Sequence, residues 1–215
     1  MSDYTAISVQ ALNRLTRYLQ YLRGLPSSPA NISATAIAEA LEINDVVVRK
    51  DLAQASDGGK PKIGYIKEDL IADIEHFLGY NESYDTVLVG TGNLGRALLS
   101  YGNFEKYGLN IVAAFDADAT VVGREMGGKK VLSSEKIKDI CKRLNVKIGI
   151  ITTPVAASQQ VCDALVEGGV SAIWNFAPTH LRVPREVVVK NEDMAASLAI
   201  LTKQLAENQM QYSEE

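Results

Sequence analysis

A glycine-rich turn is the clearest chemical signal in the 215-residue sequence. It follows an apolar run of strand length, residues 86–89, and opens a helical pattern. In a GxGxxG turn the first glycine permits the bend, the second admits a pyrophosphate to the backbone, and the third lets helix and strand pack closely. Phosphate also favours the N–H groups at a helix start. The predicted dinucleotide-binding residues are Gly90, Thr91, Gly92, Asn93, Leu94 and Gly95. The alternative is a tight turn that binds no ligand.

An acidic residue ends the next apolar run, residues 111–115. Asp116 stands about 20 residues beyond the last glycine, where a carboxylate holds ribose hydroxyls and repels a 2′-phosphate. This position predicts NADH and NAD⁺ as cofactors rather than their phosphorylated forms. An ordinary turn residue is the alternative, and Asp118 is close enough to take the role instead.

Two further segments follow apolar runs and therefore fall at the ligand edge of a parallel sheet. Thr153-Pro154 comes after residues 148–151, and Asn175-Phe176-Ala177-Pro178 comes after residues 172–174. Thr153 and Pro154 are predicted to line the cofactor site. Either segment could equally be a plain loop between strand and helix.

Basic residues cluster near the N-terminus although the whole chain has a net charge of −4. Residues 1–66 hold seven Lys/Arg and six Asp/Glu, and four of those seven are Arg49, Lys50, Lys60 and Lys62. A recognition helix presents such side chains to the major groove of DNA, and a basic hairpin reaches the minor groove or phosphates. The four residues are therefore predicted to bind DNA. A solvated helix face and a solvated turn are the alternatives.

The elements that must position these basic residues follow helical spacing. Leucines over residues 12–22 form one apolar face, and Ser33 stands where the cap of a second helix belongs. Residues 45–52 contain three consecutive valines, which favour a strand by propensity, but as a helix they leave Arg49 and Lys50 outward. A short strand is expected over residues 63–66. This order predicts a winged helix-turn-helix domain over residues 1–80.

The pattern changes after a polar link over residues 81–85, the predicted domain boundary. Apolar strand-length runs then alternate with helical stretches over residues 95–101, 135–144 and 158–167, which predicts an α/β fold with a parallel sheet covered by helices. A Rossmann dinucleotide-binding domain is therefore expected over residues 84–190. An apolar stripe at helical spacing predicts a final helix within residues 192–215; its members are Met194, Leu198, Leu201 and Leu205.

Composition narrows the remaining function classes. The sequence has no apolar run long enough to span a membrane and no signal peptide at its start, so a soluble cytoplasmic protein is expected. Cys141 and Cys162 form no CxxC pair and His76 lies far from His180, which disfavours a zinc site. No Ser/His/Asp set or carboxylate pair is found, so no catalytic residue is predicted. An NAD-dependent oxidoreductase is the runner-up hypothesis, and a thiol sensor would require the two cysteines to meet.

The sequence resembles the Rex family of bacterial redox-sensing transcriptional repressors over nearly its whole length. The order and spacing of several short motifs carry the resemblance. They are Arg14-Leu15 with Tyr18-Leu19, Val48-Arg49-Lys50-Asp51-Leu52, Gly64-Tyr65, Gly92-Asn93-Leu94-Gly95 with Ala97-Leu98, Ala114-Phe115-Asp116, Thr153-Pro154 with Gln159, and Asn175-Phe176-Ala177-Pro178.

The resemblance implies a homodimer that binds an inverted-repeat operator when NAD⁺ is high and releases it when NADH binds. It implies that the C-terminal helix, residues 192–215, is exchanged between protomers. Two switch residues are implied: Tyr101, near the nicotinamide, and Asp193, which pairs with a first-helix arginine. Here Gln20 replaces that arginine, so a weaker pairing is expected unless Arg23 substitutes. The chain also lacks the family's usual wing arginine and aromatic residue within residues 55–62.

Overall fold

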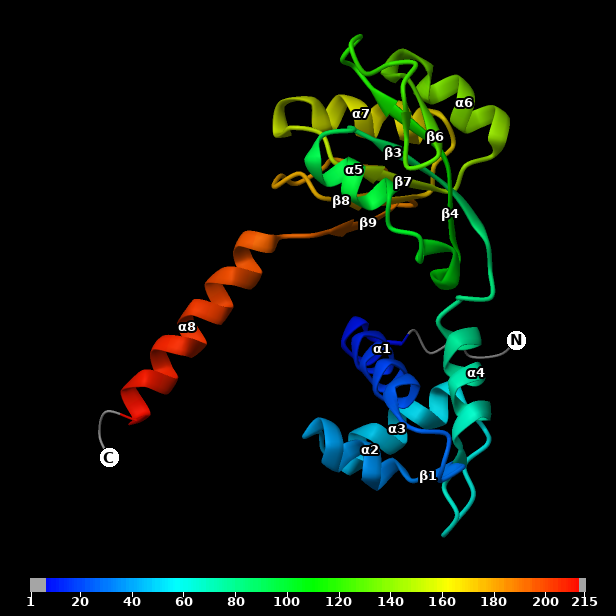
Figure 1. Ribbon diagram of the computed structural model, residues 1–215, viewed down its shortest axis with the longest axis vertical. Coiled ribbons are helices and arrows are strands. Elements are labelled where there is room, and N and C mark those ends of the chain that lie inside the picture. The colour runs from blue at the N-terminus through cyan, green and yellow to red at the C-terminus, as the bar shows by residue number, and fades with distance from the viewer. Residues whose placement is uncertain (1–6, 213–215) are drawn as a thin grey trace. The chain divides into compact units, whose positions relative to one another are not determined.

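A computed structural model describes residues 7–212. The chain divides into two compact units, Met1–Glu82 and Ser83–Glu215, whose elements are labelled in Figure 1. The first six residues of the predicted range 1–80 and the last three of the range 192–215 lie outside the described residues. The polar link is shorter than predicted, because the first strand of the second unit already begins at Tyr84.

The first unit has the helix order predicted from the sequence. Its elements are α1 (Val9–Gly24), β1 (Asn31–Ile32), α2 (Ala34–Leu41), α3 (Asp45–Ala55), β2 (Tyr65–Ile66) and α4 (Lys67–Phe77). The Ser33 hydroxyl accepts a hydrogen bond from the Ala36 N–H and caps α2, as predicted. Asn44 caps α3 in the same way through the Val46 N–H. This cap, and burial of Val48, explain why three valines form a helix here.

The predicted strand over residues 63–66 is too long. Only Tyr65 and Ile66 are strand, paired antiparallel with Ile32 and Asn31. The preceding residues form the turn of a hairpin, in which the Lys60 N–H donates to the Gly64 carbonyl at 2.9 Å. Gly64 has a φ of +82°, which breaks the extended conformation. The hairpin is therefore a tight turn with a very short second strand.

A partly buried ion pair joins α1 to α3. The Arg14 guanidinium donates two hydrogen bonds to the Asp51 carboxylate, at 2.6 and 2.9 Å, and the Tyr18 hydroxyl donates a third at 2.9 Å. Burial, together with the bond to Asp51, raises the pKa of Tyr18 to about 12. The bond to Asp51 also raises the pKa of Arg14. Because α3 carries the predicted recognition residues, this network fixes them relative to the first helix.

Replacing Asp51 with alanine is expected to destabilise the first unit strongly. The change leaves the Arg14 cation and the Tyr18 hydroxyl without their acceptor, which costs about 3 kcal/mol of unfolding free energy. Urea denaturation followed by circular dichroism measures the loss. Asp57→Ala, which removes an exposed carboxylate on the hairpin, is the matched control. A denaturation midpoint for Asp51→Ala equal to that of the control would contradict a role for the ion pair.

The second unit is a seven-stranded sheet with helices on both faces. Its elements are β3 (Tyr84–Val89), α5 (Asn93–Leu99), η1 (Phe104–Tyr107), β4 (Leu109–Asp116), β5 (Glu125–Met126), β6 (Lys129–Ser133), η2 (Ser134–Lys136), α6 (Ile137–Leu144), β7 (Ile148–Ile151), α7 (Val155–Glu167), β8 (Ala172–Asn175), β9 (Val188–Asn191) and α8 (Met194–Tyr212). The strand order is β5-β6-β4-β3-β7-β8-β9, and every pair except β5–β6 is parallel. Leaving out β5, this is the Rossmann order 3-2-1-4-5-6.

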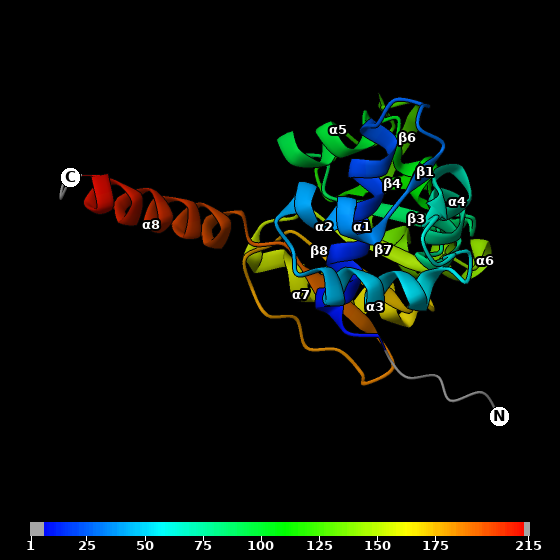
Figure 2. The ribbon, with the colours of Figure 1, turned by 90° about the horizontal axis from the view of Figure 1, so that it is seen from below.

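Alternating side chains of the central strands enter two separate cores. Val87 and Ile151 pack with residues of α6 and α7, whereas Leu88 and Ile150 pack with Leu99 of α5. Figures 1 and 2 show α6 and α7 on the face of the sheet opposite α5. The four strands predicted as apolar runs are confirmed as β3, β4, β7 and β8. Strands β6 and β9 were missed, because both lie toward the sheet edges and carry exposed polar residues.

Helix α8 exposes the apolar stripe that the sequence predicted. Met194, Leu198, Leu201 and Leu205 are 69%, 59%, 60% and 56% exposed in the single chain. Four such side chains on one helix are a surface that needs a partner, since exposed apolar patches of this kind mark interaction sites. No helix among the described residues is long and apolar enough to cross a lipid bilayer.

Candidate functional site

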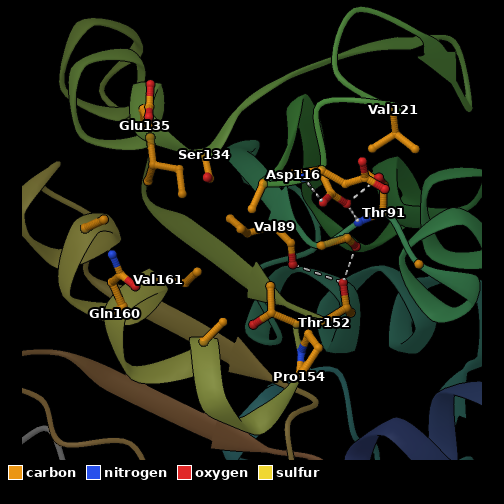
Figure 3. A pocket seen from close by; sticks show the side chains of 18 of the residues that line it. Val89, Thr91, Asp116, Val121, Ser134, Glu135, Thr152, Pro154, Gln160 and Val161 are labelled. Carbon is orange, nitrogen blue, oxygen red and sulfur yellow. Dashed lines mark hydrogen bonds between the residues drawn. The ribbon is translucent and has the colours of Figure 1, made fainter.

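A pocket of about 900 Å³ opens where the strand order of the sheet reverses, at the carboxyl ends of β3 and β7. Open α/β sheets bind ligands at this point. Three loops form most of its wall, residues 90–92 after β3, 116–118 after β4 and 152–154 after β7. Figure 3 shows Thr91, Asp116, Thr152 and Pro154 around it.

The three glycines of the turn differ in what surrounds them. Gly90 has a φ of +99°, and a Cβ there would lie 2.9 Å from the Thr152 carbonyl. A Cβ on Gly95 would lie only 1.9 Å from the Gly90 oxygen. Around Gly92, by contrast, no protein atom lies within 4 Å of an added Cβ. The chain's own packing therefore requires glycine at 90 and 95, whereas Gly92 leaves open space beside the pocket.

The Asp116 carboxylate joins the end of β4 to the glycine-rich turn. One oxygen accepts from both the N–H and the hydroxyl of Thr91 at 2.6 Å, and the other accepts from the Asp118 N–H at 3.0 Å (Figure 3). Burial acts to raise the pKa of Asp116, but these hydrogen bonds outweigh it and hold the pKa below its ordinary value. The pocket wall therefore carries a fixed negative charge at neutral pH.

The loop after β7 presents an unpaired hydroxyl. The Thr152 hydroxyl donates to the Gly90 carbonyl at 2.6 Å and so holds the turn. Thr153 Oγ1 is buried and has no hydrogen-bond partner within the described chain. Leaving a buried polar group unpaired costs about 1–3 kcal/mol. Because Thr153 lines the pocket, a polar group of a ligand is the natural partner for this atom.

The structure brings together only part of the predicted cofactor set. Six predicted residues line the pocket: Gly90, Thr91, Gly92, Asp116, Thr153 and Pro154. Asn93, Leu94 and Gly95 lie in the first turn of α5, outside the lining. Tyr101, the last residue of the predicted helical stretch 95–101, lies outside the helix and does not line the pocket. It follows the end of α5, is 46% exposed, and meets Phe104 edge-on at 4.9 Å.

Several lining residues were missed by sequence reasoning: Arg96, Val121, Ser134, Glu135, Gln160 and Val161. Arg96 directly follows the glycine motif, and that position could have revealed it. The others come from the segment after β4, from η2 and from α7. No local pattern marks them, because only the fold brings these segments to one place.

The predicted DNA-binding residues are exposed and lie on neighbouring elements of the first unit. The Arg49 guanidinium donates to the Thr35 hydroxyl at 3.2 Å and to the Asp45 carboxylate at 3.1 Å, which orients it on α3. Burial raises the pKa of Tyr65, and the positive charge of Arg49 opposes that rise, so Tyr65 of β2 lies near α3. A Cβ on Gly59 would come within 2.8 Å of the Tyr65 ring. Tyr65 thus connects the recognition helix to the hairpin, and Lys50, Lys60 and Lys62 are also exposed there.

Comparisons with known proteins agree with both units. The family described as "CoA binding domain" matches residues 81–179, and "Putative DNA-binding protein N-terminus" matches residues 6–53. The redox-sensing transcriptional repressor Rex of Bacteroides thetaiotaomicron is 35% identical, covering 97% of this chain and 95% of its own. The Rex of Desulforamulus reducens is 38% identical, covering 91% and 93%. The chain belongs to the Rex family of redox-sensing transcriptional repressors.

Solved Rex structures confirm the fold. The crystal structure of RSP in complex with β-NAD⁺ and operator DNA superposes with a TM-score of 0.89 at 32% identity, over 97% of both chains. RSP in complex with β-NADH gives a TM-score of 0.88 at 31% identity, over 98% of this chain and 100% of that one. The predicted fold class, a DNA-binding unit followed by a Rossmann unit, is therefore confirmed.

Two residues of the Rex motifs, Asn175 and Gln159, form hydrogen bonds within the chain. Asn175 is fully buried, and its amide nitrogen lies within 3.1 Å of three acceptors, the carbonyls of Ala177 and Thr179 and Asn191 Oδ1. Gln159 exchanges two hydrogen bonds of 2.9 Å with the Arg182 backbone. Both side chains hold the long connection from β8 to β9. Their place in the family pattern is explained by this internal role.

Proposed function

We propose that this Rex-family chain is a transcriptional repressor that senses the NADH/NAD⁺ ratio. It binds an inverted-repeat operator as a homodimer, and NADH releases it. The main support is that one chain contains both a helix-turn-helix unit and a Rossmann unit. The first exposes Arg49 and Lys50, and the pocket of the second holds the Asp116 carboxylate. The RSP complexes with NAD⁺ plus operator, and with NADH, support this assignment.

In this proposal the pocket holds NADH or NAD⁺. Gly92, where the backbone is open, would admit the pyrophosphate, and the dinucleotide would supply a partner for Thr153 Oγ1. Asp116 would accept hydrogen bonds from the ribose hydroxyls, and its charge would disfavour a 2′-phosphate. The signal in this proposal is whether NADH or NAD⁺ is bound, and no reaction of the cofactor is required. The cofactor-binding residues proposed from the sequence are Gly90, Thr91, Gly92, Asn93, Leu94, Gly95, Asp116, Thr153, Pro154 and Tyr101.

Asp116→Asn is expected to narrow the preference for NADH over NADPH. The amide keeps an oxygen for Thr91 but removes the charge that repels a 2′-phosphate, so NADH affinity falls roughly tenfold while NADPH affinity falls less. Isothermal titration of both nucleotides measures the difference. Asp118→Asn is the matched control. If that variant, and not Asp116→Asn, loses the preference, Asp118 is the ribose carboxylate.

The first unit reads DNA through α3 and its hairpin. Arg49 and Lys50 face base edges in the major groove, and Lys60 and Lys62 contact phosphates or the minor groove. A two-fold dimer requires half-sites on one face of the duplex, about one helical turn or a multiple apart. Arg49 already has two partners that orient its guanidinium, which favours a directed contact over a diffuse one.

Alanine substitutions in the two pairs of basic residues are expected to weaken DNA binding in different ways. Arg49→Ala costs about 1–3 kcal/mol of operator affinity if the side chain reads a base, and it relaxes specificity at that position. Lys60→Ala and Lys62→Ala instead weaken binding to every sequence and reduce the salt slope by about one unit for each lost phosphate contact. Fluorescence anisotropy across a salt series separates these outcomes. A quadruple variant, with Lys50 also replaced, that still gives a normal footprint would disprove the DNA surface.

We further propose that α8 is exchanged between protomers and that Asp193, Tyr101 and Gln20 form the switch. In the single chain Asp193 Oδ1 accepts from the Ala196 N–H at 2.8 Å and caps α8. Arg23 forms an ion pair with Glu75 at 2.9 Å, so it is already engaged within its own unit. Gln20 is exposed on α1 and is left as the partner of Asp193. An uncharged amide makes this pairing weaker than one with arginine.

We infer a regulatory protein of the cytoplasm rather than an enzyme, in line with its repressor relatives. Among the described residues that line the pocket there is no histidine, tyrosine or lysine to act as a proton donor. Burial raises the pKa of Cys141 and Cys162 to about 11, which disfavours a thiol sensor. The deciding experiment selects genomic fragments with the purified protein in the presence of NAD⁺ or NADH. Equal recovery in both, or NADH turnover with small carbonyl compounds, would overturn the proposal.

A further inference from the structure

We propose that Trp174 and Glu192 are positioning residues that fix the start of α8 and couple it to the dinucleotide pocket. This inference rests on the function proposed above and adds residues to it that no motif marks. It starts from the segment between β9 and α8, where the chain leaves the sheet. It then follows a row of aromatic rings back to the pocket.

The segment that precedes α8 is held by β8. The Trp174 indole N–H donates to the Glu192 carboxylate at 3.0 Å, and the Glu192 backbone N–H donates to the Asn175 carbonyl at 2.8 Å. The next residue, Asp193, caps α8. Glu192 is therefore tied to the sheet by both its backbone and its side chain, directly before the helix begins. The direction in which α8 leaves the sheet depends on these two bonds.

Trp174 is also the centre of a row of four rings. Its ring meets Phe104 edge-on at 6.0 Å and Phe176 at 4.8 Å, and Phe104 in turn meets Tyr101 edge-on at 4.9 Å. Edge-to-face pairs at these distances have preferred geometries, so movement of one ring favours movement of the next. The row links segments that lie more than seventy residues apart in the sequence.

Both ends of this row are attached to the pocket. The Tyr101 N–H donates to the Leu98 carbonyl in α5, and α5 begins at the glycine-rich turn. The Phe176 N–H donates to the Ile151 carbonyl at 2.9 Å, next to the loop that carries Thr153. A dinucleotide that displaces the turn or this loop therefore acts on Trp174 from two sides. Through Glu192, the displacement reaches the start of α8.

The hydrogen bond from the Trp174 indole fixes the position of the Glu192 side chain, which the charge of Glu192 alone would not do. The Glu192 carboxylate also lies 3.8 Å from the Lys190 ammonium, but that lysine side chain is 68% exposed and outside the row of rings. An exposed ion pair contributes little and has no fixed geometry. Lys190 is therefore a control position on the same carboxylate.

The test compares four variants in the full-length protein, Trp174→Phe, Glu192→Ala, Glu192→Gln and Lys190→Ala. The quantity measured is the ratio of operator affinity with NAD⁺ to operator affinity with NADH. Trp174→Phe keeps the ring but loses the N–H, and Glu192→Ala loses the acceptor. Both are expected to reduce the ratio roughly five- to tenfold, the size of one hydrogen bond to a partly exposed charge, with NADH affinity changed less than about twofold. Their double variant should be no worse than either. Glu192→Gln, which keeps an acceptor oxygen, restores the ratio, and Lys190→Ala leaves it unchanged.

A spectroscopic readout separates positioning from simple stabilisation. Trp174 is the only tryptophan in the sequence, so tryptophan emission reports the surroundings of this residue alone. Emission is expected to change when operator is added in the presence of NAD⁺, and this change should disappear in Glu192→Ala. A wild-type ratio in Glu192→Ala and Trp174→Phe would overturn the inference. An equal loss of ratio in Lys190→Ala would do the same. A wild-type protein that binds neither operator nor NADH would instead refute the proposed function itself.

Discussion

Replacing Gly92 with valine is expected to abolish NADH binding while the protein stays folded. An added Cβ at this position meets no atom within 4 Å beyond its chain neighbours, so we expect the fold to tolerate the change. It does fill the space in which the pyrophosphate would approach the backbone. We expect NADH affinity to fall by at least about 100-fold, or ~2.7 kcal/mol. Calorimetric titration and thermal unfolding on the same sample measure both properties.

Two further glycines make this experiment decisive. Gly24→Val introduces the same side chain at another open position, in the first unit, and should leave NADH binding intact. Gly95→Ala is the opposite case, because its Cβ would lie 1.9 Å from the Gly90 oxygen. That variant should lose stability and NADH binding together. Unchanged NADH affinity in Gly92→Val would remove the dinucleotide hypothesis.

Deleting residues 192–215 is expected to abolish dimerisation and operator binding together. The deletion removes α8, whose leucine side chains are more than half exposed in the single chain and need a partner surface. A monomer engages one half-site, and the loss of linked binding weakens operator affinity by about 10²–10⁴-fold. Light scattering gives the oligomeric state, and anisotropy gives the affinity.

The same prediction can be tested without truncation. The pair Leu198→Glu and Leu201→Glu keeps the helix but places charge on its apolar stripe, so it should behave as the deletion does. Lys203→Ala changes the exposed ion pair with Glu207 and serves as the control. A truncated protein that remains dimeric and still releases operator with NADH would contradict the exchanged helix.

Sequence reasoning succeeded where the signal is local. The apolar runs of β3, β4, β7 and β8 are buried on both faces, so their composition alone identified them. Ser33 was recognisable as a cap because it acts on a residue only three positions away. The GxGxxG turn is likewise continuous in the chain. The helix predicted over residues 45–52 was correct despite its valines, since the spacing of buried residues outweighs propensity.

The features that sequence reasoning missed depend on distant contacts. Asp116 is tied to Thr91 across 25 positions, and Trp174 bonds Glu192 across 18. No spacing rule anticipates such pairs, because the sheet order decides them. Strand β9 was missed for a related reason: at the sheet edge one side is exposed, and Lys190 and Asn191 hide the apolar pattern. Tyr101 was misplaced because α5 ends at Leu99, two residues before the end of the predicted stretch.

The ion pair between Arg14 and Asp51 restricts how a repressor of this design can respond. Because Asp51 holds α3 on α1, the recognition helix cannot rotate or unwind independently of the helix beneath it. This network therefore favours movement of α1 and α3 together. In the proposed dimer, NADH would then change the distance along the operator between the two DNA-binding units and not the structure of either unit. Moving the half-sites apart by a base pair or two also rotates one of them about the duplex by roughly 35–70°, so such operators would be bound more weakly although their bases are unchanged.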